Sequence, residues 1–156
     1  MRDLLISAPI APHAKGRPRT AIRGGFATVY TPKATKQWET ALLLHAIRQI
    51  GRPGITEPVR VDCLFVLARP KRIRKSERQG LLWAPVRPDV DNLRKAVLDA
   101  LSPLWTDDAL VVCGDSLKCY AEAGEAPRVV IRIRAAGEHE RAEVRAVDLG
   151  LLEGCE

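Results

Sequence analysis

The sequence predicts a single α+β domain in which a mixed β-sheet is packed by two main helices. Two segments, residues 59–68 and 128–134, alternate apolar and polar residues over much of their length, as half-buried strands do. Two others, residues 31–50 and 92–101, repeat apolar residues at helical spacing. A chain of 156 residues, 46% of them hydrophobic, is long enough to bury one core.

Residues 4–10 are expected to form the first strand, which Pro9 and Pro12 end. Gly24-Gly25 predicts a hairpin turn between residues 20–23 and 26–30. Three cations precede this hairpin on a loop stiffened by glycine and proline: Lys15, Arg17 and Arg19. The loop and hairpin fit a surface that lies on a nucleic-acid backbone, although taken alone an ordinary solvated turn explains them better.

The first helix is predicted over residues 31–50, with Thr31 as its N-cap, Pro32 at its first position and Gly51 after its end. Helical spacing predicts that five apolar side chains face the core: Trp38, Ala41, Leu42, Ala46 and Ile50. A strand at residues 59–68 should follow, with its second half buried on both faces because residues 64–68 are continuously apolar.

The densest basic run lies directly after this strand, at residues 69–78, and holds six cations against one acid. Its members include Arg69, Lys71, Arg72, Arg74 and Lys75. Such a run is usually a solvated segment. Its place between a core strand and an acidic segment favours contact with DNA. Trp83, which follows, is interpreted as an anchor to the core, with stacking on a base as the alternative.

Charge is distributed unevenly along the chain. Residues 1–88 contain 17 Lys and Arg against 5 Asp and Glu, a net charge of +12, whereas residues 89–156 contain 8 against 14, a net charge of −6. The basic half suggests a polyanionic partner, because lysine and arginine contacts with phosphates supply affinity that does not depend on base sequence.

The acidic segment begins at Asp89. Asp91 is expected to cap a helix over residues 92–101 whose apolar stripe faces the core: Leu93, Ala96, Val97, Ala100 and Leu101. Asp91 and Lys95, four residues apart, are then neighbours on the opposite side, and Asp99 lies at its margin. Asp107-Asp108 follow after a short connection, and strands are expected near residues 109–113 and 117–121.

Several carboxylates with one lysine beside a basic half are what a metal-dependent nuclease needs. Mg²⁺ prefers oxygen ligands and keeps several waters, so two or three convergent carboxylates suffice to hold it. Lys95 would neutralise charge on the scissile phosphate or help to activate water. The structural alternative is that Asp91 is only a cap, and that Asp89 and Asp107-Asp108 belong to solvated turns.

The pattern that runs from Pro88-Asp89-Val90-Asp91-Asn92-Leu93 through Lys95-Ala96 and Asp99-Ala100-Leu101 to Asp107-Asp108 resembles the signature of the RusA-type Holliday junction resolvases. Lys15-Gly16-Arg17-Pro18-Arg19 and Tyr30-Thr31-Pro32 are also similar to the N-terminal part of that family. The resemblance implies a homodimeric endonuclease that uses Mg²⁺, with Mn²⁺ as a substitute, to nick four-way DNA junctions symmetrically in recombination and repair. It assigns metal binding and catalysis to Asp89, Asp91 and Asp108, and the essential lysine to Lys95.

Residues 1–137 are expected to form the endonuclease domain and residues 138–156 a tail, either a short helix or disordered. No apolar run reaches 18 residues and no signal peptide is evident, so we expect a cytoplasmic protein with no membrane contact, encoded by a bacterium or a prophage. The four cysteines form no C-x-x-C pair and are interpreted as buried, reduced side chains.

Two other functions fit the same residues. One is that of a non-catalytic module that binds DNA or RNA, with its acids serving as caps. The other is that of a nuclease that acts on flaps or other branched DNA. The first alternative requires neither Mg²⁺ nor strand cleavage, and the second requires a preference for flaps over four-way junctions.

Overall fold

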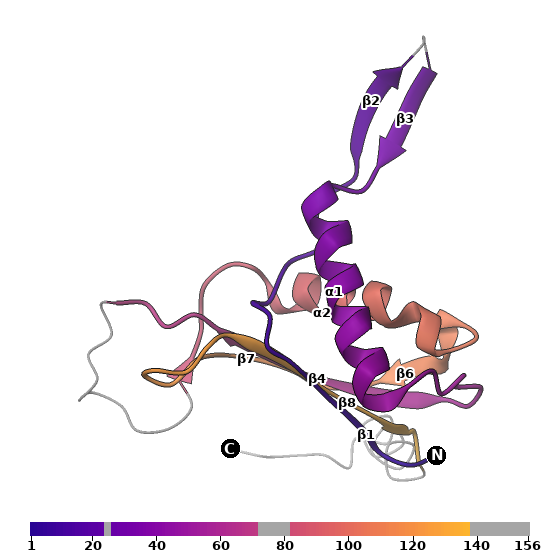
Figure 1. Ribbon diagram of the computed structural model, residues 1–156, viewed down its shortest axis with the longest axis vertical. Coiled ribbons are helices and arrows are strands. Elements are labelled where there is room, and N and C mark those ends of the chain that lie inside the picture. Colours follow the sequence, from indigo (N-terminus) through magenta and orange to yellow (C-terminus); the bar gives the residue numbers. More distant parts are fainter. Residues whose placement is uncertain (24–25, 72–81, 138–156) are drawn as a thin grey trace, which may run out of the picture.

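A computed structural model describes residues 1–23, 26–71 and 82–137 (Figure 1). Its main elements follow one another along the chain: β1 (Leu4–Ala8), β2 (Arg19–Arg23), β3 (Phe26–Tyr30), α1 (Lys33–Ile50), β4 (Val59–Leu67), β5 (Leu82–Trp83), α2 (Val90–Leu101), β6 (Val111–Cys113), β7 (Ser116–Tyr120) and β8 (Arg128–Ala135). Two 3₁₀ turns, η2 (Ser102–Leu104) and η3 (Asp108–Leu110), connect α2 to β6. The predicted DNA contacts Arg72, Arg74 and Lys75, and the predicted tail, lie outside the described residues.

The main sheet is mixed, as the sequence predicts. Its strand order is β1-β8-β4-β7-β5, and β6 pairs with the start of β4. β4 runs antiparallel to β8 and parallel to β6 and β7, while β5 is antiparallel to β7. The predicted α+β class, a mixed sheet with two helices, is confirmed.

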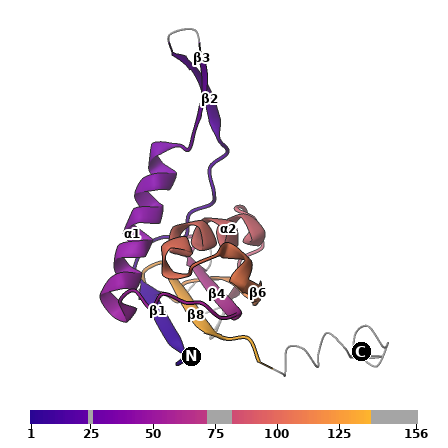
Figure 2. The same cartoon turned by 90° about the vertical axis from the view of Figure 1, so that its right-hand side faces the viewer.

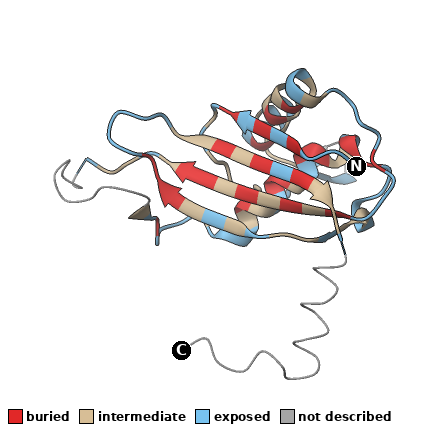
Figure 3. Cartoon of the chain, turned by 90° about the horizontal axis from the view of Figure 1, so that it is seen from below, coloured by how far each residue is buried: buried red, intermediate tan, exposed pale blue. Residues whose placement is uncertain are grey.

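Both helices pack on one face of the sheet, and the opposite face is seen in Figure 3. The predicted inward residues of β8, Val129, Ile131 and Ile133, are fully buried against this layer. The second half of β4 is buried less completely than predicted. Phe65 and Val66 are buried, but Leu64 and Leu67 are only partly covered and Ala68 is exposed.

Helix α1 begins later than the sequence predicts. Pro32 occupies the N-cap position and no side chain caps the helix, so the expected cap by Thr31 is wrong. The helix ends as predicted at Gly51, which has a φ of 69° and donates its amide hydrogen bond to the carbonyl of Ile47. Glycine is suited to this position because a positive φ carries no Cβ penalty there.

Helix α2 begins two residues earlier than predicted, with Asp89 rather than Asp91 at its N-cap and no side-chain capping bond. The proposed capping role of Asp91 is therefore wrong, and Asp91 lies in the first helical turn. The predicted core stripe is correct, because all five residues of the stripe are buried. Burial of this stripe fixes the rotation of α2 and turns its polar side outward.

Strands β2 and β3 form a separate two-stranded hairpin that stands away from the body, as two perpendicular views show (Figures 1 and 2). Every residue of β3 is exposed. The hairpin was predicted, but its separation from the sheet was not. Within the described ranges, no helix combines the length and apolar character that a membrane span requires.

Candidate active site

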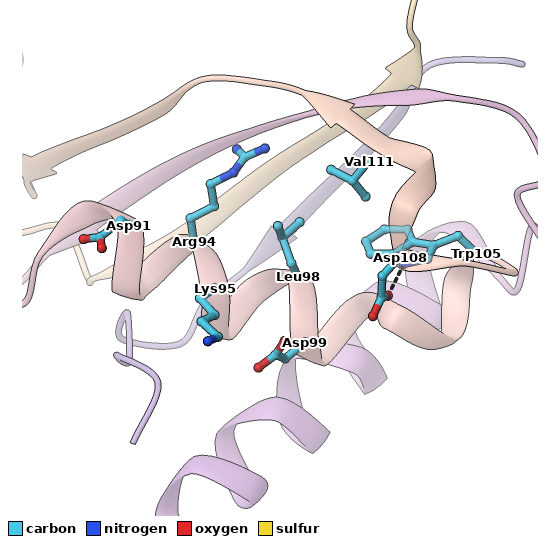
Figure 4. A pocket seen from close by; sticks show the side chains of 8 residues that line it. All are labelled: Asp91, Arg94, Lys95, Leu98, Asp99, Trp105, Asp108 and Val111. Atoms are coloured by element: carbon cyan, nitrogen blue, oxygen red, sulfur yellow. Dashed lines mark hydrogen bonds between the residues drawn. The ribbon is translucent and has the colours of Figure 1, made fainter. Parts of the chain in front are cut away.

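The outward side of α2 forms one wall of a pocket, and the segment that follows the helix completes it (Figure 4). Along the pocket, Figure 4 shows Asp91 at one end and Asp108 at the other, with Lys95 and Asp99 between them. The full lining is Asp91, Arg94, Lys95, Leu98, Asp99, Trp105, Asp108 and Val111. We call this hollow the α2 pocket. It brings together three of the four predicted catalytic residues.

The fourth predicted residue, Asp89, lies in a neighbouring pocket that also includes Asp91. This second hollow, here called the Trp83 pocket, is lined by Trp83, Asp89, Val90, Asp91, Ser116, Leu117 and Lys118. Asp91 is therefore common to both pockets. Its position in the first turn of α2, rather than at the cap, leaves its carboxylate at the boundary between Asp89 on one side and Lys95 on the other.

The two neighbouring acids Asp107 and Asp108 have different environments. Asp107 is the N-cap of η3, and its Oδ1 accepts a hydrogen bond of 2.8 Å from the backbone amide of Ala109. Asp108 lines the α2 pocket and accepts a hydrogen bond of 2.8 Å from the indole Nε1 of Trp105. Trp105 is only 6% exposed, so this bond orients the Asp108 carboxylate from a fixed, buried donor. Asp107 is a structural cap, and Asp108 is the acid that faces the pocket.

No three acidic, histidine or cysteine side chains of the described ranges gather closely enough to form a metal cluster. The predicted set of Asp89, Asp91 and Asp108 is thus distributed over two adjoining pockets, and the three-ligand site stays a prediction. The pair Asp89 and Asp91 nonetheless fits a hard divalent cation, because Mg²⁺ is commonly held by one or two carboxylates and completes its coordination with water.

Two basic side chains that the sequence did not mark as structural hold the site together. Lys118 Nζ donates hydrogen bonds to the carbonyls of Val86, at 2.5 Å, and Pro88, at 2.7 Å. It thereby fixes the loop that ends at Asp89. Lys118 thus serves the backbone of the acidic segment.

Arg94, which also lines the α2 pocket, attaches α2 to the sheet. Its guanidinium donates to the carbonyl of Val61 at 2.8 Å and to the hydroxyl of Ser116 at 3.2 Å. These bonds tie α2 to β4 and to the start of β7. This role of Arg94 was not predicted, because a single arginine one position before Lys95 has the same pattern as a solvated helix residue.

Lys15 is engaged by carboxylates. Its ammonium group donates to Glu39 of α1 at 2.7 Å and pairs with Asp99 of α2 at 2.6 Å. Burial lowers the pKa of Lys15, but hydrogen bonds and charge from Asp99 and Glu39 outweigh this effect and raise the pKa above its usual value. The predicted DNA contact at Lys15 stays a prediction, and the described arrangement gives Lys15 a role in joining the two helices.

The other predicted DNA contacts of the described ranges lie around the acidic segment. Arg17 is exposed and lines a hollow with Arg87, Pro88, Asp89 and Asn92. Arg69 and Lys71 follow β4 directly, and Lys71 is exposed. Arg19 is the first residue of β2. Of these cations, Arg17 is the one that the structure places beside a candidate catalytic acid.

Comparison with known proteins agrees with this arrangement. The family model described as endodeoxyribonuclease RusA matches residues 9–134, which include both helices and every candidate catalytic residue. The chain is also 36% identical over 130 residues to the uncharacterized protein YqaN of Bacillus subtilis (strain 168), a match that covers 79% of this chain and 89% of YqaN. The chain therefore belongs to the RusA family of endodeoxyribonucleases, which are hydrolases that act on DNA.

Proposed function

We propose that this endonuclease resolves four-way (Holliday) DNA junctions by symmetric hydrolysis of phosphodiester bonds, as a Mg²⁺-dependent homodimer that serves recombination and repair. The observation that carries the proposal is the position of Asp91, which adjoins Asp89 in one pocket and shares the other with Lys95 and Asp108. The enzyme is proposed to act on DNA in the cytoplasm of a bacterium, encoded by the host or by a prophage.

Asp89 and Asp91 are the residues proposed to hold the cation, with Asp108 as the third acid of the site. Mg²⁺, or Mn²⁺ in its place, would supply charge stabilisation and a more acidic bound water. Lys118 keeps the Asp89 loop in place through its two carbonyl contacts. Trp105 holds Asp108 in the orientation that faces the α2 pocket.

Lys95 lies one helical turn after Asp91 and lines the same pocket. Its ammonium group is proposed to neutralise charge on the scissile phosphate. Arg17 beside Asp89 is proposed to contact the DNA backbone next to the site. The other cations of the predicted DNA surface are proposed to do the same, except Lys15, whose ammonium group pairs with Glu39 and Asp99. The acids proposed to bind the metal ion thus lie beside the lysine and arginine side chains proposed to bind phosphates.

A homodimer suits the substrate, because two active sites related by a two-fold axis match a junction of near two-fold symmetry. The projecting hairpin offers apolar surface for such an association. Ile22 is 78% exposed and Val29 is 65% exposed. Exposed apolar side chains gathered on one projecting element are typical of an interaction site rather than of a free surface.

Incubation of the purified protein with a synthetic four-way junction tests the proposal, with and without Mg²⁺, beside linear duplex and flap substrates. We expect paired nicks in the junction that require the metal. Asp91→Asn should abolish cutting and retain junction binding, because it removes one negative charge and little volume. Asp107→Asn is the matched control, since Asp107 serves only as a cap, and this variant should cut nearly as well as the wild type.

Other outcomes favour the rival functions. Binding that depends on salt without cleavage of any substrate would support a non-catalytic nucleic-acid module. A preference for flaps would replace the junction as substrate. Normal cutting by Asp91→Asn would show that the active site lies elsewhere.

A further inference from the structure

We propose that Trp83 is a stacking platform for a nucleobase that lies next to the scissile phosphate, and so helps to select the position of the cut. This inference rests on the proposed nuclease function, because the base in question belongs to the DNA that Asp89 and Asp91 act on. It assigns a specificity-determining role to a residue outside the acidic signature.

Trp83 differs from the other two tryptophans of the chain. Trp38 donates its indole hydrogen to the carbonyl of Ala11 at 2.8 Å, and Trp105 donates to Asp108 at the same distance. Both are packed on the core. Trp83 is 65% exposed, so its interpretation as an anchor to the core is wrong. A tryptophan left largely in water keeps an apolar face unburied, which is unfavourable unless that face meets a partner.

The backbone beneath Trp83 is held firmly although the side chain is exposed. β5 is antiparallel to β7, with Trp83 opposite Cys119, and the next residue, Ala84, donates a hydrogen bond of 3.2 Å to the carbonyl of Lys118. Lys118 in turn holds the loop that leads to Asp89. Trp83 and Asp89 are therefore attached to the same strand β7, and their relative position is fixed by it.

The surroundings of the indole suit a base attached to a phosphate. Trp83 shares its pocket with both acids, and Leu117, 49% exposed, adds an apolar surface beside it. A nucleotide whose phosphate lies at Asp89 and Asp91 carries its base within the same hollow. Stacking on an aromatic side chain accepts any base, because every base has a π face.

A protein partner fits this hollow less well. Cores of protein interfaces are depleted in charged residues, since buried carboxylates must be desolvated. The Trp83 pocket contains two aspartates and a lysine around its aromatic side chain. The mixture of an exposed aromatic face and candidate metal ligands therefore favours a nucleotide as the occupant.

The test uses the full-length protein and four-way junctions that carry 2-aminopurine at positions flanking the mapped cut. Binding is measured in EDTA, so that no cleavage occurs, and the stacked base is detected by quenching of 2-aminopurine fluorescence. Trp83→Ala is compared with Trp83→Phe, which keeps an aromatic face, and with Leu44→Ala, which removes an apolar side chain that is 48% exposed on α1. Circular dichroism checks that each variant is folded.

We expect Trp83→Ala to weaken junction binding by roughly 5- to 100-fold and to abolish the quenching at one position. Trp83→Phe should keep junction binding and quenching within a few-fold of the wild type, and Leu44→Ala should behave as the wild type. In Mg²⁺, Trp83→Ala should also spread the cuts over more positions, whereas a merely structural residue would lower the rate at unchanged positions.

The inference is overturned if the wild type cuts junctions but Trp83→Ala binds, quenches and cuts as the wild type does. It is also overturned if Trp83→Ala alters sedimentation of the free protein, which would make this surface a protein interface. If the wild-type protein itself neither binds nor cuts any DNA, the proposed function is refuted. That outcome differs from failure of the inference, in which the wild type cuts and Trp83→Ala has no effect.

Discussion

At the scale of single residues, the structure separates cations that stabilise the fold from cations available to a ligand. Lys15 and Arg17 belong to one basic loop, and the sequence assigns them the same role. The structure places Lys15 between Glu39 and Asp99, each less than 3 Å away, and leaves Arg17 exposed beside Asp89. The two nearby charges therefore differ in environment, because Lys15 forms ion pairs with Glu39 and Asp99 whereas Arg17 lines an open hollow with Asp89.

This difference predicts opposite effects of two matched substitutions. Lys15→Gln should lower the free energy of unfolding by about 1–2 kcal/mol, because Glu39 and Asp99 lose their partly buried partner, and should leave the salt dependence of DNA binding unchanged. Arg17→Gln should leave stability unchanged and reduce the slope of log K against log salt by about 0.9, the value of one phosphate contact. Urea unfolding and binding titrations at several salt concentrations measure both. A reduced salt slope for Lys15→Gln would instead assign Lys15 to DNA.

Cys63 supplies a prediction about pH. Burial raises the pKa of its thiol from 9.0 to about 11, while the charge of Arg94 acts in the opposite direction. The folded state thus holds this proton more tightly than the unfolded state does. The resulting stability is fully present below pH 9 and is lost as the pH rises towards 11.

Urea unfolding in the presence of a reductant should therefore show a loss of roughly 2 kcal/mol between pH 8 and pH 10.5 that is attributable to Cys63. Cys63→Ala should lack this contribution, so its stability should fall less steeply over the same interval. Equal pH slopes for the two proteins would show that the Cys63 thiolate is not disfavoured in the folded state.

At the scale of elements, one glycine allows the connection between β6 and β7 to pass close to β4. Gly114 joins β6 to β7 with a φ of 140°, and a Cβ at this position would lie 1.9 Å from the carbonyl oxygen of Val61. A backbone atom cannot move away as a flexible side chain would. Because β4 and this connection lie close together, the carbonyl of Val61 and the start of β7 are both within reach of Arg94 on α2.

Gly114→Ala should accordingly destabilise the protein by about 2–4 kcal/mol, from the clash and the strained φ together. Gly54→Ala is the matched control, because Gly54 also has a positive φ, 57°, but nothing lies within 4 Å of its added Cβ. That variant should cost about 1 kcal/mol. Thermal and urea unfolding compare the two, and equal losses would mean that the contact with Val61 relaxes freely.

Periodicity predicted the elements of this fold well because each one buries a single face. The stripe of α2 from Leu93 to Leu101 and the alternation of β8 follow directly from which side chains must leave water. The start of α2 was displaced by two residues, since Asp89 and Asp91 are both acceptable caps by residue type. This shift moves Asp91 from a structural role into the candidate site.

The parts of the site that were not predicted depend on contacts between distant segments. Lys118 on β7 holds the carbonyls of Val86 and Pro88, and Trp105 orients Asp108. Neither role has a periodic signal, because a hydrogen bond to a carbonyl requires only that two segments meet. The exposure of Trp83 was likewise undetectable, since an aromatic residue after a basic run fits either an anchor or a free surface.

At the scale of the whole molecule, the chain consists of a packed α+β body and a projecting hairpin (Figures 1 and 2). In the hairpin, Thr20 pairs with Val29 and Ile22 with Ala27, whereas Phe26 pairs with Arg23. Because paired residues share a face and neighbours alternate, Ile22 and Val29 lie on one face and Phe26 on the other. One face is thus apolar without a cation, which suits a second copy of the chain.

The proposed homodimer therefore predicts that the two faces of the hairpin respond differently to substitution. Ile22→Thr with Val29→Thr keeps β-branched residues in both strands and removes apolar surface, so the hairpin should persist while self-association weakens by at least about tenfold. Phe26→Thr, the matched change on the opposite face, should leave the dimer intact. Sedimentation velocity over a concentration series measures both.

The melting temperature of the monomer should change little, because among the described strands β2 and β3 pair with each other and with no strand of the main sheet. Junctions cut by the double variant should show single nicks in place of paired nicks, since simultaneous cutting requires two sites in one complex. If Phe26→Thr alone dissociates the dimer, the interface lies on the opposite face of the hairpin. If the dimer is unaltered in both variants, the subunits contact each other through the α+β body, and the hairpin is free to contact DNA.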